Sequence, residues 1–294
     1  MRPLYLQGCG TALVTPFTKK GEVDYPAYIE CIKRQVRSGV DFLVPLATTG
    51  ETPTLSTEEK QKLFALTKEH GGGLPLVAGC GSNSLPATLA NIRDLEAWGA
   101  DALLVVVPFY NKPTQEGQYQ YFKAIAEATS KPIVVYNVPG RTGANMSADT
   151  IIRLASEFEN IIATKEASGN YSQVSEIIRR APAGFSVLSG DDDMTFAIMA
   201  TGGHGVISVA SNLAPVEVSS MTRAMLEGDV NTARELHHRL FPLFKACFVE
   251  SNPIPVKAGM ALKGLIGRQV RLPLSVATEK TEDIMADVIR ELWK

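Results

Sequence analysis

Short apolar runs alternate with amphipathic segments along the chain, and the alternation repeats eight times. The runs are rich in β-branched and other apolar residues and are too short for typical helices, so we interpret each as a buried strand. The predicted strands cover residues 11–15, 42–47, 75–80, 102–107, 133–138, 161–167, 185–189 and 205–209. Between them, Ser56 and Ser147 offer hydroxyl caps to predicted helices that have acidic residues in or near the first turn.

Strands that alternate with helices predict a parallel sheet with right-handed crossovers, and eight such units close naturally into a (β/α)8 TIM barrel. An open doubly wound sheet is the alternative. It is disfavoured because no GxGxxG or GxxxxGKS motif opens a helix. After about Gly228 the pattern turns helical, over residues 230–249, 255–265 and 281–293. We therefore predict a barrel over residues 1–228 and a helical appendage over residues 229–294, packed on the barrel.

Composition narrows the class of protein. The 294 residues are 45% hydrophobic and 20% charged, which is typical of a globular chain and argues against disorder. The 29 basic and 31 acidic residues form no basic block, so we do not expect nucleic acid as a partner.

The scattered cysteines and the short apolar stretches indicate where in the cell the protein is expected. Four cysteines with no CxxC pair predict reduced thiols rather than disulfides or a zinc knuckle. Residues 1–8 lack the apolar region of a signal peptide, and the most apolar stretch, residues 102–108, is too short for a membrane helix. We expect a cytoplasmic protein with no membrane partner.

Lys165 lies within residues 161–167, and it is the only lysine placed in a run that reads as a buried strand. Burial disfavours the ammonium form, so the pKa falls and a neutral amine becomes available to attack a carbonyl carbon. The implied chemistry is a Schiff base. The alternative is a lysine that pairs with a buried carboxylate or extends its stem to the strand end.

Further polar residues follow the predicted strands at the ends where TIM barrels carry their chemistry. Thr48 and Thr49 with the following amides could bind the carboxylate of a keto acid, or could form only a hydroxyl-capped turn. Tyr136 could transfer protons, or could be a core tyrosine with a satisfied hydroxyl. Arg141 could bind a substrate carboxylate, or could be solvated. Their convergence with Lys165 on one barrel mouth favours the catalytic interpretation.

Acidic and histidine residues give no metal site. The run Asp191 to Asp193 is more typical of a cap on the next helix than of chelation, and no convincing set of further ligands accompanies it. His204 precedes the eighth strand, at the end of the barrel away from the chemistry, and His237 has no HExxH context. We expect no metal and no nucleotide cofactor.

Six motifs occur in order along the chain, at residues 10–17, 48–51, 136–143, 165–169, 202–208 and 252–257. Together they resemble the pyruvate-dependent class I aldolase superfamily, which is N-acetylneuraminate lyase-like. Residues 137–143 resemble most the subgroup that condenses pyruvate with L-aspartate 4-semialdehyde. The resemblance runs from about Gly8 to the C-terminal helices. It implies a TIM barrel lyase of amino-acid biosynthesis that forms a homotetramer, a dimer of dimers.

That resemblance also implies the roles of individual residues. The implied catalytic residues are Lys165, Tyr136, Thr48 and Tyr110, and the implied substrate-binding residues are Thr49, Arg141, Gly190 and Ile207. Lys165 would form the pyruvate imine and Tyr136 would shuttle protons. Thr48 and Tyr110 would complete a hydroxyl relay, with Tyr110 donated by the neighbouring subunit. Thr49 would hold the pyruvate carboxylate and Arg141 that of the semialdehyde, while the Gly190 and Ile207 carbonyls would line the pocket.

The product implied for this subgroup is (2S,4S)-4-hydroxy-2,3,4,5-tetrahydrodipicolinate, on the route to diaminopimelate and lysine. One alternative is another pyruvate-dependent aldolase, such as a 4-hydroxy-2-oxoglutarate aldolase, because its glyoxylate also brings a carboxylate to Arg141. An alternative of a different class is an inactive pyruvate-binding or scaffold barrel. The presence of Lys165, Tyr136, Thr48 and Tyr110 together argues against it.

The sequence departs from the resemblance at the pocket where some members bind L-lysine as an inhibitor. Histidine, glutamate and tyrosine side chains are expected there, but the matching residues are Thr57, Lys60, Ala87 and Phe109, and only Asn83 fits. A lost carboxylate and a gained ammonium both oppose binding of a diamine. We predict that millimolar L-lysine leaves the steady-state rate unchanged. Clear inhibition at that concentration would contradict this prediction.

Overall fold

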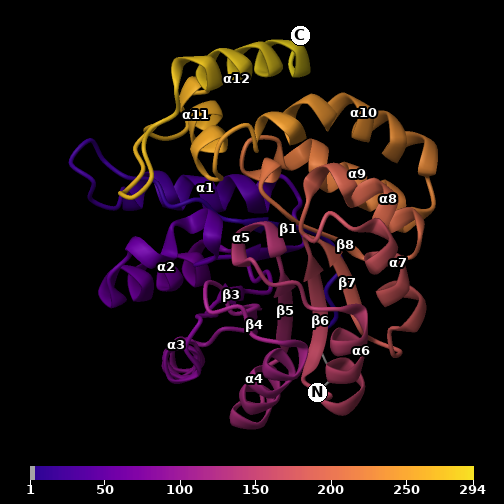
Figure 1. Ribbon diagram of the computed structural model, residues 1–294. Coiled ribbons are helices and arrows are strands. Elements are labelled where there is room, and N and C mark those ends of the chain that lie inside the picture. The colour runs from indigo at the N-terminus through magenta and orange to yellow at the C-terminus, as the bar shows by residue number, and fades with distance from the viewer. Residues whose placement is uncertain (1–3) are drawn as a thin grey trace. The chain divides into compact units, whose positions relative to one another are not determined.

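The computed structural model describes residues 4–294, in which eight parallel strands alternate with helices (Figure 1). This is the predicted (β/α)8 TIM barrel, and helices follow its last strand. The residues form two compact units, one of residues 4–8 and 75–207 and the other of residues 9–74 and 208–294. The boundary expected after Gly228 falls inside the second unit and stays a prediction. Residues 1–3, which belong to the segment expected to lack a signal peptide, lie outside the described residues.

The first unit contains six strands in the order β8-β7-β6-β5-β4-β3, each parallel to the next. They are β3 (Val77–Gly79), β4 (Ala102–Val106), β5 (Ile133–Asn137), β6 (Ile161–Glu166), β7 (Ser186–Ser189) and β8 (Gly205–Ser208). Strands β5 and β6 are buried along their whole length. Strands covered on both faces read as continuous apolar runs, which is why the sequence pattern reveals them.

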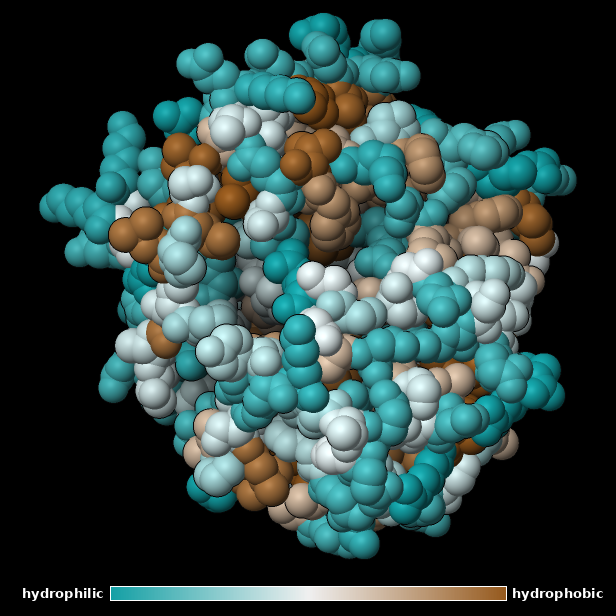
Figure 2. Space-filling view, in the orientation of Figure 1, coloured by the Kyte–Doolittle hydropathy of each residue, from teal (hydrophilic) through white to brown (hydrophobic). Residues whose placement is uncertain are grey.

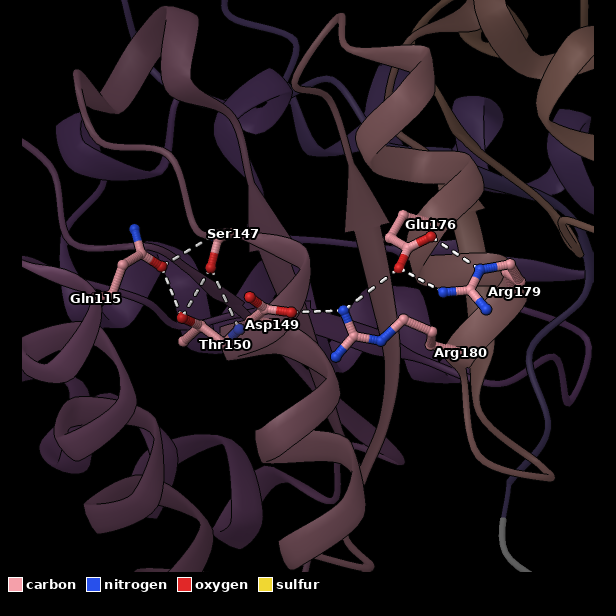
Figure 3. A network of polar contacts seen from close by, with 7 residues as sticks. All are labelled: Gln115, Ser147, Asp149, Thr150, Glu176, Arg179 and Arg180. Carbon is pink, nitrogen blue, oxygen red and sulfur yellow. Dashed lines mark hydrogen bonds and ion pairs between the residues drawn. The ribbon is translucent and has the colours of Figure 1, made fainter.

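Helices connect these strands. They are α3 (Leu85–Trp98), α4 (Gln115–Ala128), α5 (Pro139–Thr142), α6 (Ala148–Glu157), α7 (Tyr171–Arg180) and α8 (Thr195–Ala200), with a 3-10 turn η3 (Asp192–Met194) before α8. The Ser147 hydroxyl accepts from the Thr150 N–H, so the predicted cap of α6 is confirmed. Figure 3 shows the polar network that joins α4, α6 and α7, in which Arg180 bonds both Asp149 and Glu176. Exposed pairs of this kind add little stability.

The second unit holds β1 (Gly8–Ala12) paired in parallel with β2 (Phe42–Val44). Its helical elements are α1 (Tyr25–Arg37), η1 (Thr48–Gly50), η2 (Thr52–Thr54), α2 (Thr57–His70), η4 (Ala210–Asn212), α9 (Pro215–Glu227), α10 (Val230–Ala246), α11 (Ile254–Leu262) and α12 (Glu279–Leu292). Helix α10 lies along α9, and α12 packs on α11 (Figure 1). Ser56 and Glu59 form a full capping box on α2, which confirms the second predicted cap.

Two predictions of local structure need correction. The first strand is Gly8–Ala12, not residues 11–15. The weak strand propensity of Gly8 and Gly10 hid its start, and Gly10 is needed because a Cβ there would lie 2.0 Å from the Phe42 ring. The second strand stops at Val44, three residues early, where the chain turns into η1. The three C-terminal helices lie within three residues of their predicted bounds.

None of the helices within residues 4–294 is long and apolar enough to cross a membrane. The face in Figure 2 is largely hydrophilic, and its hydrophobic patches are separated from one another.

Strand β8 begins at a glycine that no other residue can replace without conflict. Gly205 has φ 151°, and a Cβ there would lie 2.0 Å from the Gly8 carbonyl oxygen. We predict that Gly205→Ala destabilises the protein by about 3 kcal/mol or more, because backbone atoms cannot move aside as side chains do. Gly228→Ala is the matched control, since Gly228 also has positive φ (83°) but open space around it. Its cost should be about 1–2 kcal/mol.

Thermal unfolding followed by circular dichroism measures both variants. The explanation is wrong if Gly205→Ala melts as close to the wild type as Gly228→Ala does.

Candidate active site

Lys165 is the centre of the candidate site. It lies on β6, only 4% exposed, between the register neighbours Tyr136 on β5 and Leu188 on β7. Burial lowers the pKa of Lys165 to about 8, and the charges of Asp191 and Asp192 only partly offset this effect. About half of the side chain is therefore the neutral amine at pH 8. This is the protonation state that attack on a carbonyl carbon requires.

Tyr136 lies directly beside this amine. Its ring centroid is 4.3 Å from the Lys165 Nζ, and its backbone pairs with that of Lys165 across β5 and β6. Burial raises the pKa of Tyr136 to about 12, so the phenol is protonated at neutral pH. A buried neutral phenol can give a proton to a leaving oxygen and take it back later. The geometry therefore combines a nucleophile with an acid and base.

Gly190 makes room for the lysine. It follows β7, and a Cβ there would lie 3.1 Å from the Lys165 Cε and 2.7 Å from the Ala167 Cβ. Its N–H donates to the Glu166 carbonyl at 2.6 Å, which holds the turn after β7 against β6. A side chain at this position would press on the reactive amine.

Asp191 and Glu166 are acidic residues near Lys165 that the sequence reasoning did not identify as part of the site. Burial raises the pKa of Asp191 to about 6, with neighbouring Asp193 adding to the effect and Lys165 opposing it. Burial also raises the pKa of Glu166 to about 7. Asp191 follows β7, the strand next to β6, and is 26 residues from Lys165 in the sequence, which carries no signal of this proximity. Only the fold reveals it.

Asp191 also corrects a prediction. It is the residue before η3, but its side chain makes no capping hydrogen bond, so the expectation that it caps the next helix is wrong. No group of three metal-ligating side chains occurs within residues 4–294.

Glu166 belongs to a network of hydrogen bonds that supports the loop after β5, between Asn137 and Met146. Its carboxylate accepts from the side chains of Asn137 at 3.0 Å and Ser168 at 2.7 Å. Asn137 in turn accepts from the Met146 N–H at 3.0 Å and donates to the Asn145 side chain at 2.8 Å. Both ends of the loop between Asn137 and Met146 are thus tied together.

Arg141 lies in that loop, on the short helix α5, and is exposed. Its charge is near enough to lower the pKa of both Tyr136 and Lys165. The guanidinium therefore adds positive charge near the reactive pair, where a substrate carboxylate would be attracted.

Tyr110 belongs to the same unit but points to solvent. It is 87% exposed and has φ 71°, in the left-handed region, and its N–H donates to the Thr142 carbonyl at 3.3 Å. Ile207 lies on β8 and is fully buried. The first unit thus brings together Lys165, Tyr136 and Gly190.

Thr48 and Thr49 belong to the second unit, where they form η1 with Gly50. Thr48 is exposed, whereas Thr49 is 3% exposed and its hydroxyl accepts from the Asn252 side chain at 2.9 Å. Neither η1 nor η2 has a side-chain cap bond, so the hydroxyls of Thr48 and Thr49 do not cap these two elements.

Known proteins resemble the chain over almost its whole length. A sequence profile of the Dihydrodipicolinate synthetase family matches residues 5–292. The 4-hydroxy-tetrahydrodipicolinate synthase of Phocaeicola vulgatus is 49% identical over 288 residues, which is 98% of this chain and 97% of that protein.

Solved structures of dihydrodipicolinate synthases also resemble the chain. A crystal structure of dihydrodipicolinate synthase from Thermotoga maritima has a TM-score of 0.96 at 43% identity, covering 98% of this chain and 99% of that one. A structure described as the first monomeric dihydrodipicolinate synthase variant has a TM-score of 0.95 at 43% identity, covering 98% of this chain and 97% of that one. The barrel, the buried lysine beside a tyrosine and these similarities lead to one conclusion: the chain belongs to the dihydrodipicolinate synthetase family.

Proposed function

We propose that the chain is a 4-hydroxy-tetrahydrodipicolinate synthase, a class I aldolase-type lyase that condenses pyruvate with L-aspartate 4-semialdehyde. The observation that carries the proposal is the buried Lys165 amine, with its pKa near 8, placed 4.3 Å from the Tyr136 ring. The names of relatives near 50% identity support the same pair of substrates.

The first half of the reaction uses the buried pair. The neutral Lys165 amine attacks C2 of pyruvate, and the Tyr136 phenol protonates the oxygen that leaves as water. The resulting imine withdraws electrons from C3, which loses a proton to give an enamine. We give Thr48 and Tyr110 the proton relay, and Thr49 the binding of the pyruvate carboxylate, as the family resemblance implies.

The second half of the reaction uses Arg141, in the loop after β5. Arg141 attracts the carboxylate of the semialdehyde, and the enamine carbon attacks its aldehyde carbon. The amino group of the semialdehyde part then attacks the imine carbon, which breaks the bond to Lys165 and closes the ring. The Lys165 amine is regenerated. The proposed chemistry uses no metal and no nucleotide, because the amine itself activates the carbonyl group.

Assembly and location are part of the proposal. We propose a homotetramer in which Tyr110 completes the site of a neighbouring subunit. The 87% exposure of Tyr110 supports this role, since a hydroxyl in solvent serves no site of its own chain. A cytoplasmic location is supported by the four cysteines of the described residues, which are buried and form no disulfide.

The 4-hydroxy-2-oxoglutarate aldolase alternative predicts a different second substrate, so the substrates decide between the two. We expect pyruvate consumption with L-aspartate 4-semialdehyde to exceed that with glyoxylate by several orders of magnitude in kcat/KM. The physical reason is that only the semialdehyde carries the amino group that displaces Lys165. Steady-state kinetics with both aldehydes measures the ratio. Equal efficiency, or preference for glyoxylate, would overturn the assigned reaction.

The field of Asp191 gives a prediction about pH. The rate of imine formation with pyruvate should rise with pH and level off above about 8, as Lys165 loses its proton. Asp191 raises the pKa of Lys165, so Asp191→Asn should lower that pKa and move the profile to lower pH. Rapid quenching with borohydride, followed by intact mass measurement, traps the imine at each pH.

Asp94→Asn on α3 is the control, because it removes the same charge from an exposed residue that is not among the groups that shift the pKa of Lys165. Lys165→Ala should give no trapped adduct at any pH. An unchanged profile in Asp191→Asn, or one moved to higher pH, contradicts the electrostatic account.

A further inference from the structure

Two buried charges in the second unit have no role in the proposed reaction. Glu51 and Lys257 belong to the sequence motifs at residues 48–51 and 252–257, and both are almost fully buried. The Lys257 Nζ lies 2.7 Å from the Glu51 Oε1, with side chains 0% and 1% exposed. Two buried charges in direct contact, 206 residues apart in sequence, require an explanation.

Glu51 sits at a strained point of the backbone. It has φ 55° and ψ 33°, the left-handed conformation, and it joins the end of η1 to the start of η2. Residues other than glycine adopt this conformation only when their surroundings hold them there. The Glu51 N–H donates to the Thr48 carbonyl at 3.0 Å. The strained residue therefore closes the turn that carries Thr48 and Thr49.

Both oxygens of the Glu51 carboxylate are held. Lys257 on α11 bonds Oε1, and the backbone N–H of Arg271 bonds Oε2 at 2.9 Å. Each donor comes from the segment that follows the barrel strands. The side chain that anchors the strained turn is thus fixed by the C-terminal helices and the chain after them.

Lys257 also reaches the turn by a second route. Its Nζ donates to the Thr15 carbonyl at 2.9 Å, and the Thr15 hydroxyl donates to the Gly50 carbonyl at 2.7 Å. Lys257 is therefore linked to the turn in two ways, directly through Glu51 and indirectly through Thr15, which bonds Gly50. Asn252, five residues before Lys257, adds the bond to the Thr49 hydroxyl.

We propose that the Glu51–Lys257 pair positions the Thr48–Gly50 turn for binding of the pyruvate carboxylate, which makes the C-terminal helices a determinant of pyruvate affinity. The inference rests on the proposed function, since it takes pyruvate as the ligand of the turn. Glu51 and Lys257 are positioning residues, because they act through Thr48 and Thr49. A solely structural pair would change stability without changing pyruvate affinity in the folded enzyme.

The test compares Glu51→Gln, Lys257→Met and the double variant with Glu59→Gln. Glu59 is the matched control, because it pairs with the Arg271 side chain at 2.6 Å but does not touch the turn. We expect the KM for pyruvate to rise about tenfold or more in Glu51→Gln and Lys257→Met, because a displaced turn misplaces its donors. The KM for the semialdehyde should stay within twofold. Glu59→Gln should lower the Tm and leave both KM values unchanged.

The double variant distinguishes the loss of the positioning contact from the cost of leaving one buried charge without its partner. A single variant leaves one buried charge without its partner and could fail to fold for that reason alone, whereas the double variant removes both charges. We expect the double variant to fold and to keep the raised KM for pyruvate. Wild-type pyruvate KM in the double variant, or in a folded Glu51→Gln, overturns the proposal.

A second readout does not depend on the reaction. Amide hydrogen exchange over residues 47–52 should be faster in Glu51→Gln and in the double variant, but unchanged in Glu59→Gln. Borohydride trapping with pyruvate alone checks the ligand in the wild type. If no adduct forms, the proposed function fails, while the exchange data still decide whether the pair holds the turn. Unchanged exchange in both variants overturns the positioning role.

Discussion

Desolvation of a lysine ammonium is the interaction on which the candidate site depends. A strand at the centre of a sheet removes water from Lys165, and the nearby acidic charges are too weakly placed to restore its usual pKa. Lys257 is equally buried, yet it meets a carboxylate at 2.7 Å. Burial also lowers the pKa of Lys257, but here Glu51 opposes the shift through both its charge and a hydrogen bond. The fold thus buries two lysines, one as the proposed nucleophile and the other in an ion pair, and the direct carboxylate contact distinguishes the two.

Much of the fold could be predicted from sequence because parallel strands covered on both faces leave continuous apolar runs. The eight units, the caps at Ser56 and Ser147 and the C-terminal helices follow from such local signals. The first strand could not be placed correctly, since its glycines serve a close approach to Phe42 that only tertiary structure imposes. The short helix α5 was also hidden, because four residues carry no periodicity.

The candidate site also contains residues that could be predicted from the sequence and residues that could not. A lysine in an apolar strand is conspicuous, and so Lys165 could be identified from its neighbours in the chain. Lys257 lies in the first turn of α11, where a charged residue is common, and its partner is 206 residues away. Asp191 owes its raised pKa to burial that no local pattern predicts. Sequence thus reveals residues whose local context is unusual, and the fold is needed for those whose partners are distant.

Tyr136 and Lys165 are held by the sheet, whereas Arg141 is held by a loop, so substitutions affect the two parts of the candidate site differently. Tyr136 and Lys165 are cross-strand neighbours, so the hydrogen bonds of the sheet itself set their spacing. Arg141, in contrast, is carried by a loop whose position depends on a few side-chain bonds of Asn137. Under the proposed function, substitutions in that loop can alter which aldehyde is accepted while the pair proposed to form the imine stays in place. A barrel built this way can diversify its second substrate during evolution without reinventing its first chemical step.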